Sequence, residues 1–100
     1  DRALDQIAVQ YFLAAEESEF EVSMSVEELE IVPTAIRTRL IKLCFDQLTV
    51  GTRENSPLTH QHVMSVEALI SGWSGQGGIA LPLGVTAKRE YGRLVFNQGN

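Results

Sequence analysis

The sequence has few of the residues that build disulfides and metal centres. Its 100 residues include one cysteine and two histidines. The single cysteine, Cys44, excludes an internal disulfide and favours a reducing compartment such as the cytoplasm. His60 and His62 lie two positions apart on an expected helix, so they point to different sides and cannot share a metal ion. With only one cysteine, no zinc-binding set of ligands is expected.

Long apolar runs and a secretory leader are also missing. Glycine, serine and proline interrupt the apolar stretches, so no segment predicts a membrane span and no membrane partner is expected. The first twenty residues carry several charges, so we expect no signal peptide among them. The chain opens at Asp1, without an initiator methionine and already within an amphipathic pattern. We therefore expect it to be a piece of a longer protein.

Positive charge is scarce and unevenly distributed. The chain has eight lysines and arginines against thirteen acids, a net charge of −5. Residues 1–30 hold nine acids and one base, whereas residues 31–100 hold seven bases and four acids. A polyanion is therefore expected to touch only the second part of the chain, and weakly. Since no dense basic run exists, an ordinary solvated surface is the simpler interpretation of these charges.

Apolar residues recur at helical spacing in three segments. A hydrophobic share of 44% predicts a globular chain with a real core. The periodicity predicts helices over residues 2–17, 33–48 and 59–72. Pro33 suits the first position of the second helix, where no amide donor is needed. Thr59 is expected to cap the third helix.

The segments between these helices are shorter and less regular. Ser25 to Glu28 reads as a capping box that begins a short helical turn. Residues 20–24 alternate apolar and polar side chains, which allows a short extended segment. Residues 49–58 have the composition of a loop. On the third helix, His62 lies on the apolar stripe, and we expect it to be a hydrogen-bonded core histidine.

The last quarter of the chain alternates in the manner of β-strands. Strands are predicted over residues 78–82, 85–90 and 93–97, with a tight turn at Tyr91 and Gly92. The expected fold class is α+β. It would be a single domain over residues 1–100, a small helical bundle with a C-terminal three-stranded antiparallel β-meander packed on it.

No catalytic motif is found. The residues around Ser74 superficially resemble a nucleophile elbow, but glutamine follows where glycine is required, and the context is helix-to-strand. The glycine-rich segment from Gly75 to Gly78 matches neither a Walker loop nor a dinucleotide fingerprint. It is best interpreted as a turn that leaves a helix.

Arg37 stands out because helical geometry places it on the apolar side of its helix. A buried arginine needs a partner. One interpretation is a structural ion pair with Glu28 or Glu30. The other is a guanidinium presented to an RNA phosphate at the start of the helix.

Other cations are expected on the surface. Arg39 and Lys42 project from the second helix, and Lys88 and Arg93 share one face of the last hairpin beside Tyr91. A basic sheet face next to an aromatic side chain is typical of nucleic-acid binding, although it is also typical of a solvated face.

Three segments, taken in order, resemble a known family. They are Pro33 to Arg39, Leu58 to Val63, and Trp73 to Pro82 with its continuation through Leu94. Their order and spacing resemble the region after the catalytic domain in bacterial tRNA(Ile)-lysidine synthases, most of all the short actinobacterial form. The match runs from about residue 30 to about residue 96. Leu83 departs from the pattern, because relatives usually have glycine after Leu-Pro.

The resemblance implies a non-catalytic accessory domain that helps to hold and select tRNA(Ile). In the family, an N-terminal PP-loop domain adenylates the wobble cytidine and lysine then displaces AMP, which produces lysidine. The Ser-Gly-Gly-x-Asp-Ser signature of that domain is absent here. ATP, Mg²⁺ and lysine are therefore implied for the parent ligase and no cofactor for this chain. The implied partners are tRNA(Ile) and the PP-loop domain.

Two hypotheses follow for this chain. In the first, it recognises tRNA weakly through its basic residues. In the alternative, it is a protein-interaction or dimerisation scaffold, for example in a homodimer, without direct RNA contact. The candidate RNA-binding residues are Arg37, Arg39, Lys42, Lys88, Arg89 and Arg93.

Overall fold

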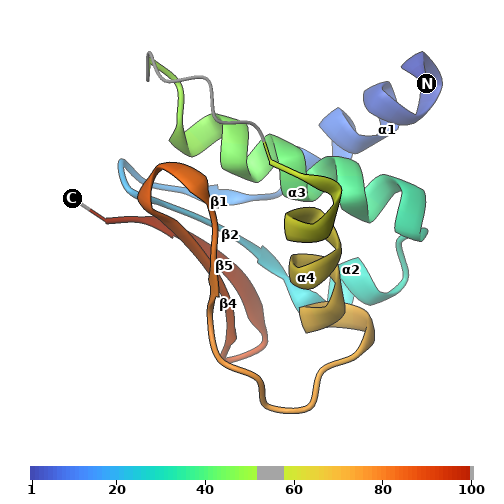
Figure 1. The fold of residues 1–100 in the computed structure, drawn as a ribbon. Coiled ribbons are helices and arrows are strands. Elements are labelled where there is room, and N and C mark those ends of the chain that lie inside the picture. Colours follow the sequence, from blue (N-terminus) through green and yellow to red (C-terminus); the bar gives the residue numbers. More distant parts are fainter. Residues whose placement is uncertain (52–57, 100) are drawn as a thin grey trace.

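The computed structural model describes residues 1–51 and 58–99, and within these ranges four helices accompany a five-stranded antiparallel sheet (Figure 1). The expected α+β class is confirmed. The expected loop over residues 49–58 falls mostly outside the described ranges. The helices are α1 (Arg2–Phe12), α2 (Val26–Glu30), α3 (Thr34–Leu48) and α4 (His60–Ser71). The strands are β1 (Glu16–Glu17), β2 (Glu21–Ser25), β3 (Ile79–Ala80), β4 (Val85–Glu90) and β5 (Arg93–Gln98), with a 3₁₀ turn, η1 (Pro82–Gly84), before β4.

The sheet is larger than the sequence pattern predicted. Its strand order is β1-β2-β5-β4-β3, so the expected meander is only its β3–β4–β5 part. The prediction of three strands was therefore incomplete. Strand β2 pairs with β5, with Val22 opposite Phe96, across more than seventy residues of sequence. Local alternation over residues 20–24 allowed an extended segment but carried no information about this distant partner.

The first helix is shorter than expected. It ends at Phe12 rather than near residue 17, because Glu16 and Glu17 pair with β2 as strand β1. Two acids at a helix C-terminus would also oppose the helix dipole. Helices α3 and α4 begin at Thr34 and His60, one residue after the expected starts.

Local capping explains where α2 and α4 begin. The Ser25 hydroxyl accepts a hydrogen bond from the amide of Glu28 at 3.3 Å, as the capping box predicted. The Thr59 hydroxyl accepts from the amide of His62 at 3.1 Å, and the Thr59 amide donates to His62 Nδ1 at 3.1 Å. His62 is therefore half-buried at the start of α4 and completes a cap, and the expectation of a core histidine was wrong.

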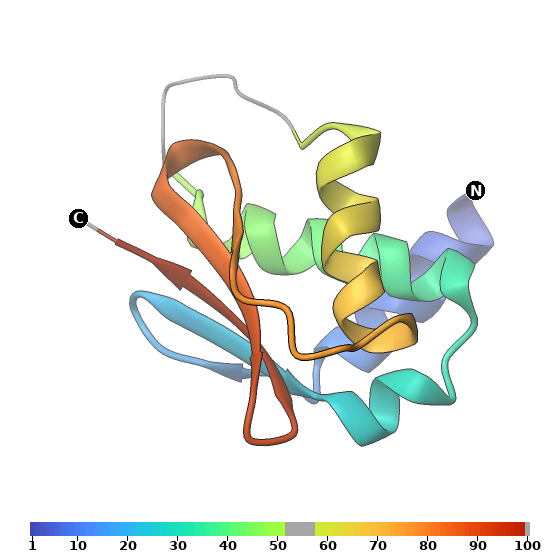
Figure 2. The same cartoon turned by 60° about the horizontal axis from the view of Figure 1, so that its bottom comes forward.

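The helices form a cover on one face of the sheet rather than a separate bundle (Figures 1 and 2). Helices α2, α3 and α4 contact the strands, and α1 packs along α3. Helix α3 therefore lies between α1 and the sheet, which explains why seven of its fifteen residues are buried. The bundle that the sequence predicted is only partly present. None of the helices in the described ranges has both the length and the apolar character needed to cross a bilayer.

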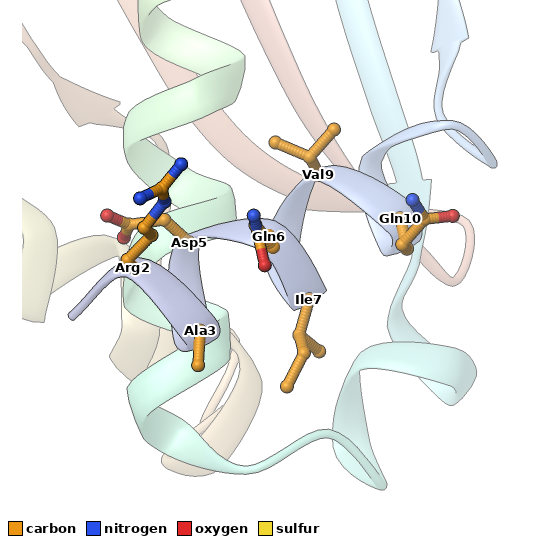
Figure 3. A pocket seen from close by; sticks show the side chains of 7 residues that line it. All are labelled: Arg2, Ala3, Asp5, Gln6, Ile7, Val9 and Gln10. Carbon is orange, nitrogen blue, oxygen red and sulfur yellow. The ribbon is translucent and has the colours of Figure 1, made fainter.

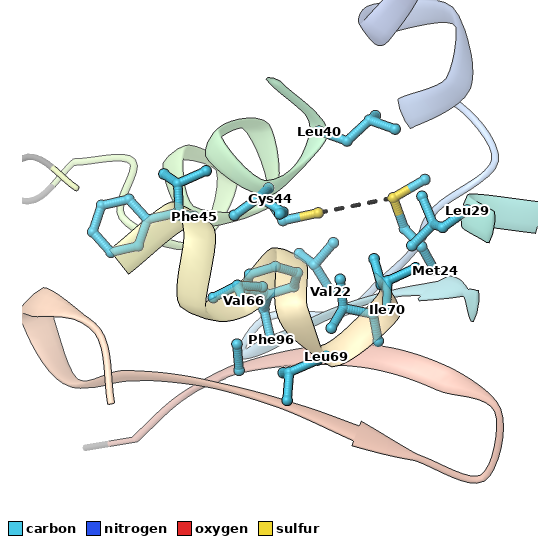
Figure 4. Close-up of a cluster of buried hydrophobic side chains, with 14 of the residues drawn as sticks. Val22, Met24, Leu29, Leu40, Cys44, Phe45, Val66, Leu69, Ile70 and Phe96 are labelled. Carbon is cyan, nitrogen blue, oxygen red and sulfur yellow. Dashed lines mark hydrogen bonds between the residues drawn. The ribbon is translucent and has the colours of Figure 1, made fainter. Parts of the chain in front are cut away.

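The core lies between the helices and the covered face of the sheet (Figure 4). Its largest fully buried side chains include Phe96, Leu40, Ile41 and Leu69. The Cys44 thiol lies 4.0 Å from the Met24 sulfur inside this core. Burial raises the pKa of the Cys44 thiol, so this cysteine stays protonated and serves as a small apolar side chain.

Among the residues that the structure describes, two other than glycine adopt positive φ angles. Leu83 has φ 62° in η1, and its side chain packs against the core. Glycine adopts this conformation without steric cost, whereas leucine does not. Tyr91 has φ 51° and Gly92 has φ 74° in the turn between β4 and β5. The tight turn predicted at these two residues is confirmed.

Candidate nucleic-acid interface

Arg37 lies inside the protein, in the first turns of α3. Its side chain is about one-tenth exposed, and its Nε donates to Glu67 Oε1 at 2.7 Å. The structural ion pair is therefore the interpretation that the structure supports, but the expected partners Glu28 and Glu30 were wrong. Glu67 comes from α4, thirty residues away. The available signal was its spacing, because Glu67 lies between Val63 and Ile70 on the buried face of α4.

The remaining donors of the Arg37 guanidinium are also occupied. Nη1 donates to the carbonyls of Val32 at 3.1 Å and Leu29 at 3.3 Å, and Nη2 donates to the Thr34 hydroxyl at 3.0 Å. The Ser71 hydroxyl donates to the second carboxylate oxygen of Glu67 at 2.6 Å. This network joins the end of α2, the start of α3 and the end of α4. Because it is enclosed and satisfied, it holds the helices together and presents no donor to a phosphate.

Arg39 and Lys42 lie on α3 where α1 crosses it. Arg39 Nε donates to Asp5 Oδ1 of α1 at 2.8 Å, and its Nη1 donates to the carbonyl of Ala35 at 2.7 Å. A groove of about 410 Å³ lies beside these residues. Lys42, which is exposed, lines this groove together with Arg39 and Asp1. Acids of α1 therefore accompany these two cations.

Arg89 faces the helices rather than the solvent. It points from β4 to the end of α4, where Nη1 donates to the carbonyl of Leu69 at 3.1 Å. Its guanidinium carbon lies 5.1 Å from the centre of the Trp73 ring. This carbonyl belongs to the last turn of α4, which has no helical partner for it. Arg89 thus caps α4 under Trp73 and is only half-exposed.

Lys88 and Arg93 share the other face of the sheet, as the sequence pattern predicted. We call this surface the open sheet face, because the helices of the described ranges all lie on the opposite side. Strand pairing places on it the side chains of Glu16, Glu21, Ser23, Thr86, Lys88, Glu90, Arg93, Val95 and Asn97.

Each cation of the open sheet face has a nearby acid. Lys88 Nζ lies 3.2 Å from Glu90 Oε2, and Arg93 Nη2 lies 3.7 Å from Glu16 Oε2. Arg93 Nε also donates to the Ser23 hydroxyl at 3.1 Å, so its side chain lies flat across the strands. Ion pairs this exposed contribute about 0–1 kcal/mol, and they open at little cost when a stronger anion arrives.

The six candidate residues therefore do not form one surface. Arg37 is in the core and Arg89 caps a helix. Arg39 and Lys42 lie beside α1, on the helical side, and Lys88 and Arg93 lie on the open sheet face. Sequence periodicity assigned the two faces of the hairpin correctly. It had no means of showing that α3 and the hairpin present their cations on different sides of the molecule.

Helix α1 leaves apolar side chains exposed, and Ile7 and Val9 point away from it in different directions (Figure 3). A groove of about 650 Å³ runs along it, and Ile7 and Val9 contribute to its lining. Ile7, Val9 and Tyr11 are each more than two-fifths exposed. This surface is a second candidate for contact, with a protein rather than with a nucleic acid.

Comparison with known proteins finds one family model and several relatives that match this chain. Residues 24–95 match the family model described as the TilS substrate binding domain. The tRNA(Ile)-lysidine synthase of Leifsonia xyli subsp. xyli is 34% identical over 99 residues, which cover 97% of this chain and 28% of that protein. The synthase of Streptomyces coelicolor is 40% identical over 72 residues, covering 72% and 20%. That of Salinispora tropica is 39% identical over 72 residues, covering 72% and 21%. The chain thus spans between a fifth and less than a third of the length of these relatives.

Proposed function

Because this chain belongs to the family of TilS substrate binding domains, we propose that it is the tRNA-recognition domain of an ATP-dependent tRNA(Ile)-lysidine synthase. In this role it is a non-catalytic accessory domain in the cytoplasm. It helps to hold tRNA(Ile) while the parent enzyme converts the wobble cytidine to lysidine.

The observation that carries this proposal is the open sheet face. It is a solvent-exposed surface, built on β2, β4 and β5, that presents Lys88 and Arg93 from neighbouring strands. Between them lies Val95, directly opposite Lys88 and almost fully covered. A sheet of this kind offers a rigid support for cations that meet a phosphate backbone. The second pair, Arg39 and Lys42, would extend the contact only if the RNA also reached the helical side.

The acids on the same face limit the strength of binding. Glu16 and Glu90 each compete with RNA for a neighbouring cation. Because such surface pairs are weak, a phosphate can displace a carboxylate at little cost. Any RNA that does not place its phosphates near Lys88 and Arg93 is repelled instead. We therefore expect weak, selective binding in which the parent enzyme supplies the rest of the affinity.

The chemical step belongs to another part of the synthase in this proposal. Among the described residues, no three side chains of His, Cys, Asp or Glu come close enough together to hold a metal ion. We assign ATP, Mg²⁺ and lysine to a PP-loop domain of the parent enzyme. That domain is then also the protein partner of this chain.

Affinity measurements with the full-length synthase and a tRNA(Ile) transcript test the proposal. Replacing Lys88 and Arg93 by glutamine together should weaken binding by about tenfold, since each removes one phosphate contact. The matched pair Arg39→Gln and Lys42→Gln changes charge by the same amount on the helical side. We expect it to weaken binding by no more than about threefold.

Unchanged affinity in the Lys88 and Arg93 double variant would refute the assignment of the open sheet face. Unchanged affinity in both double variants would leave no basic surface for the RNA. In that case the domain would act without direct RNA contact.

The exposed face of α1 favours a second candidate function, a docking scaffold. The apolar side of α3 is covered by α1 and the sheet. The exposed side chains of Ile7 and Tyr11 are available instead. Docking on the PP-loop domain or in a homodimer would cover them. If this is correct, replacing both residues by serine should lower the association constant measured by sedimentation without changing tRNA affinity.

A further inference from the structure

Tyr91 is the residue whose position the fold does not explain. Its side chain is 97% exposed, at the tip of the hairpin formed by β4 and β5. With Gly92 it forms the whole connection between Glu90 and Arg93, which pair directly. Both turn residues have positive φ angles, 51° and 74°. Such a turn prefers asparagine, aspartate or glycine at its first position, because a bulky side chain there meets the backbone.

Leu83 is a second bulky residue with a positive φ, and it differs from Tyr91 in its contacts. Leu83 also has a positive φ, but its side chain packs against the core and so gains apolar contact. The Tyr91 ring gains almost no contact within the chain. A residue that has a strained backbone conformation but gains no packing contact within the fold is typically one that contacts a ligand or partner.

The hairpin presents Tyr91 rigidly. The carbonyl of Gly92 accepts a hydrogen bond from the amide of Val26 at 2.9 Å, which fixes the turn to the start of α2. Strands β4 and β5 pair along their full length up to the turn. A ring held on such a support loses little freedom on binding.

The hairpin that carries Tyr91 is basic in sequence, although the chain as a whole is acidic and Glu16 and Glu90 lie beside its exposed cations. Residues 85–98 carry Lys88, Arg89 and Arg93 against one acid, Glu90. Lys88 and Arg93 lie on the open sheet face next to the turn. An exposed aromatic ring next to cations that can reach phosphates is the arrangement by which proteins hold an unstacked base.

We propose that Tyr91 stacks on an unpaired base of the bound RNA, while Lys88 and Arg93 contact the neighbouring phosphates. This inference rests on the proposed function and deepens it. It assigns one end of the open sheet face to a single-stranded part of the RNA, a loop or an end, rather than to a helical stem. In a stem the bases are already stacked and are not accessible to a ring.

Tyr91→Asn in the full-length synthase is the decisive variant. Asparagine suits the turn better than tyrosine, so we expect an equal or higher melting temperature. Affinity for the tRNA(Ile) transcript should nevertheless fall about five- to fiftyfold, because one stacking contact is lost. Tyr91→Phe keeps the ring and should bind within about twofold of the wild type. Ile31→Asn is the matched control, because Ile31 is also apolar and 85% exposed.

The outcomes separate this inference from the proposed function. Wild-type affinity in Tyr91→Asn, together with weaker binding by the Lys88 and Arg93 variant, would overturn the stacking role and leave the tRNA-binding function standing. Unchanged affinity in all of these variants would overturn both. A lower melting temperature of Tyr91→Asn in the absence of RNA would show that Tyr91 docks in a protein pocket, which would also overturn the inference. Equal losses in Tyr91→Phe and Tyr91→Asn would implicate the hydroxyl rather than the ring and would contradict stacking.

Discussion

The guanidinium of Arg37 is held by acceptors from α2, α3 and α4 and from the turn between α2 and α3. Its pairing with Glu67 explains why an arginine is retained on the apolar side of α3. A buried pair does not have to stabilise a fold more than apolar residues would, because both charges lose their hydration. Its value here is that only one packing of α3 on α4 satisfies both groups.

This pair leads to a prediction at the residue scale. Arg37→Ala should lower the free energy of unfolding by about 3–5 kcal/mol, since it leaves the Glu67 carboxylate buried without a partner. Replacing Arg37 by methionine and Glu67 by leucine together should recover most of that loss. Urea unfolding of the single and double variants measures both effects. A loss below about 1 kcal/mol in Arg37→Ala would contradict the assignment.

Asp46 in the last turn of α3 leads to a prediction about pH. Burial raises the pKa of its carboxyl, and the charge of Lys42 opposes part of that change. A folded-state pKa above the unfolded value means that ionised Asp46 destabilises the fold at neutral pH. Stability is regained as the pH falls through the folded pKa. The helix dipole acts against the negative charge in the same direction.

Asp46→Asn should therefore raise the free energy of unfolding at neutral pH by a few tenths of a kcal/mol, about the size of a charge effect at a helix end. The gain should disappear in acid, where the wild-type carboxyl is itself protonated. Thermal unfolding across this pH range measures it. Glu19→Gln removes a charge from an exposed position outside the helices and serves as the control. A gain that persists in acid would show that the charge of Asp46 is not its cause.

At the scale of elements, the end of α4 depends on a residue from the sheet. Arg89 binds the carbonyl of Leu69 and lies against the Trp73 ring. We expect Arg89→Met to lower the free energy of unfolding by about 1–2 kcal/mol, because it removes the cation from both the helix end and the ring. Lys88→Met, one position earlier on the open sheet face, should cost less than about 0.5 kcal/mol.

Trp73 supplies the measurement for this prediction, since it is the one tryptophan of the chain. Its fluorescence follows unfolding in urea, and in Arg89→Met the native emission should move to longer wavelength as water reaches the ring. Equal costs for the Arg89 and Lys88 variants would show that Arg89 does not cap α4.

Local sequence patterns predict the contacts of residues that lie only a few positions apart. The start of α4 follows from Thr59, because a cap involves residues only a few positions apart. Pro33 marks the start of α3 through its fixed φ, from the N-cap position and not from the expected first helical position, and it makes no side-chain cap hydrogen bond. The alternation over residues 85–90 predicted which cations face outward for the same reason. The pairing of β2 with β5 and the choice of Glu67 as partner of Arg37 depend on contacts between distant residues. Periodicity places Glu67 on the buried face of α4, but it does not tell which distant residues meet, so these two contacts could not be predicted from local pattern.

Prediction of the candidate site was limited in the same way, because it depends on contacts between distant elements. Six cations were predicted as one RNA-binding group, but the fold separates them into a core pair, a helix cap and two surfaces. The relation of Lys88 to Arg93 was predictable because one hairpin contains both. The relation of the hairpin to α3 was not, since it depends on how the helical layer packs on the sheet.

At the scale of the whole molecule, helices cover one face of the sheet, and the other face mixes cations with acids. The acids on that face should act as competitors of the RNA. Replacing Glu16 and Glu90 by glutamine together should tighten tRNA(Ile) binding by about three- to tenfold and reduce discrimination against other RNAs. Competition binding with an unrelated tRNA measures both effects. Weaker binding by this variant would mean that the two acids orient Lys88 and Arg93 rather than compete for them.

The salt dependence of tRNA(Ile) binding tests whether the open sheet face contacts the RNA backbone, because it counts the phosphates that the protein neutralises. The full-length synthase and its Lys88→Gln, Arg93→Gln double variant would be titrated with tRNA(Ile) across a range of salt concentrations. If the open sheet face meets the RNA backbone, the slope of log affinity against log salt should be smaller in the variant by about 2, about 1 for each lost contact. Equal slopes for the two proteins would show that Lys88 and Arg93 do not contact the RNA backbone.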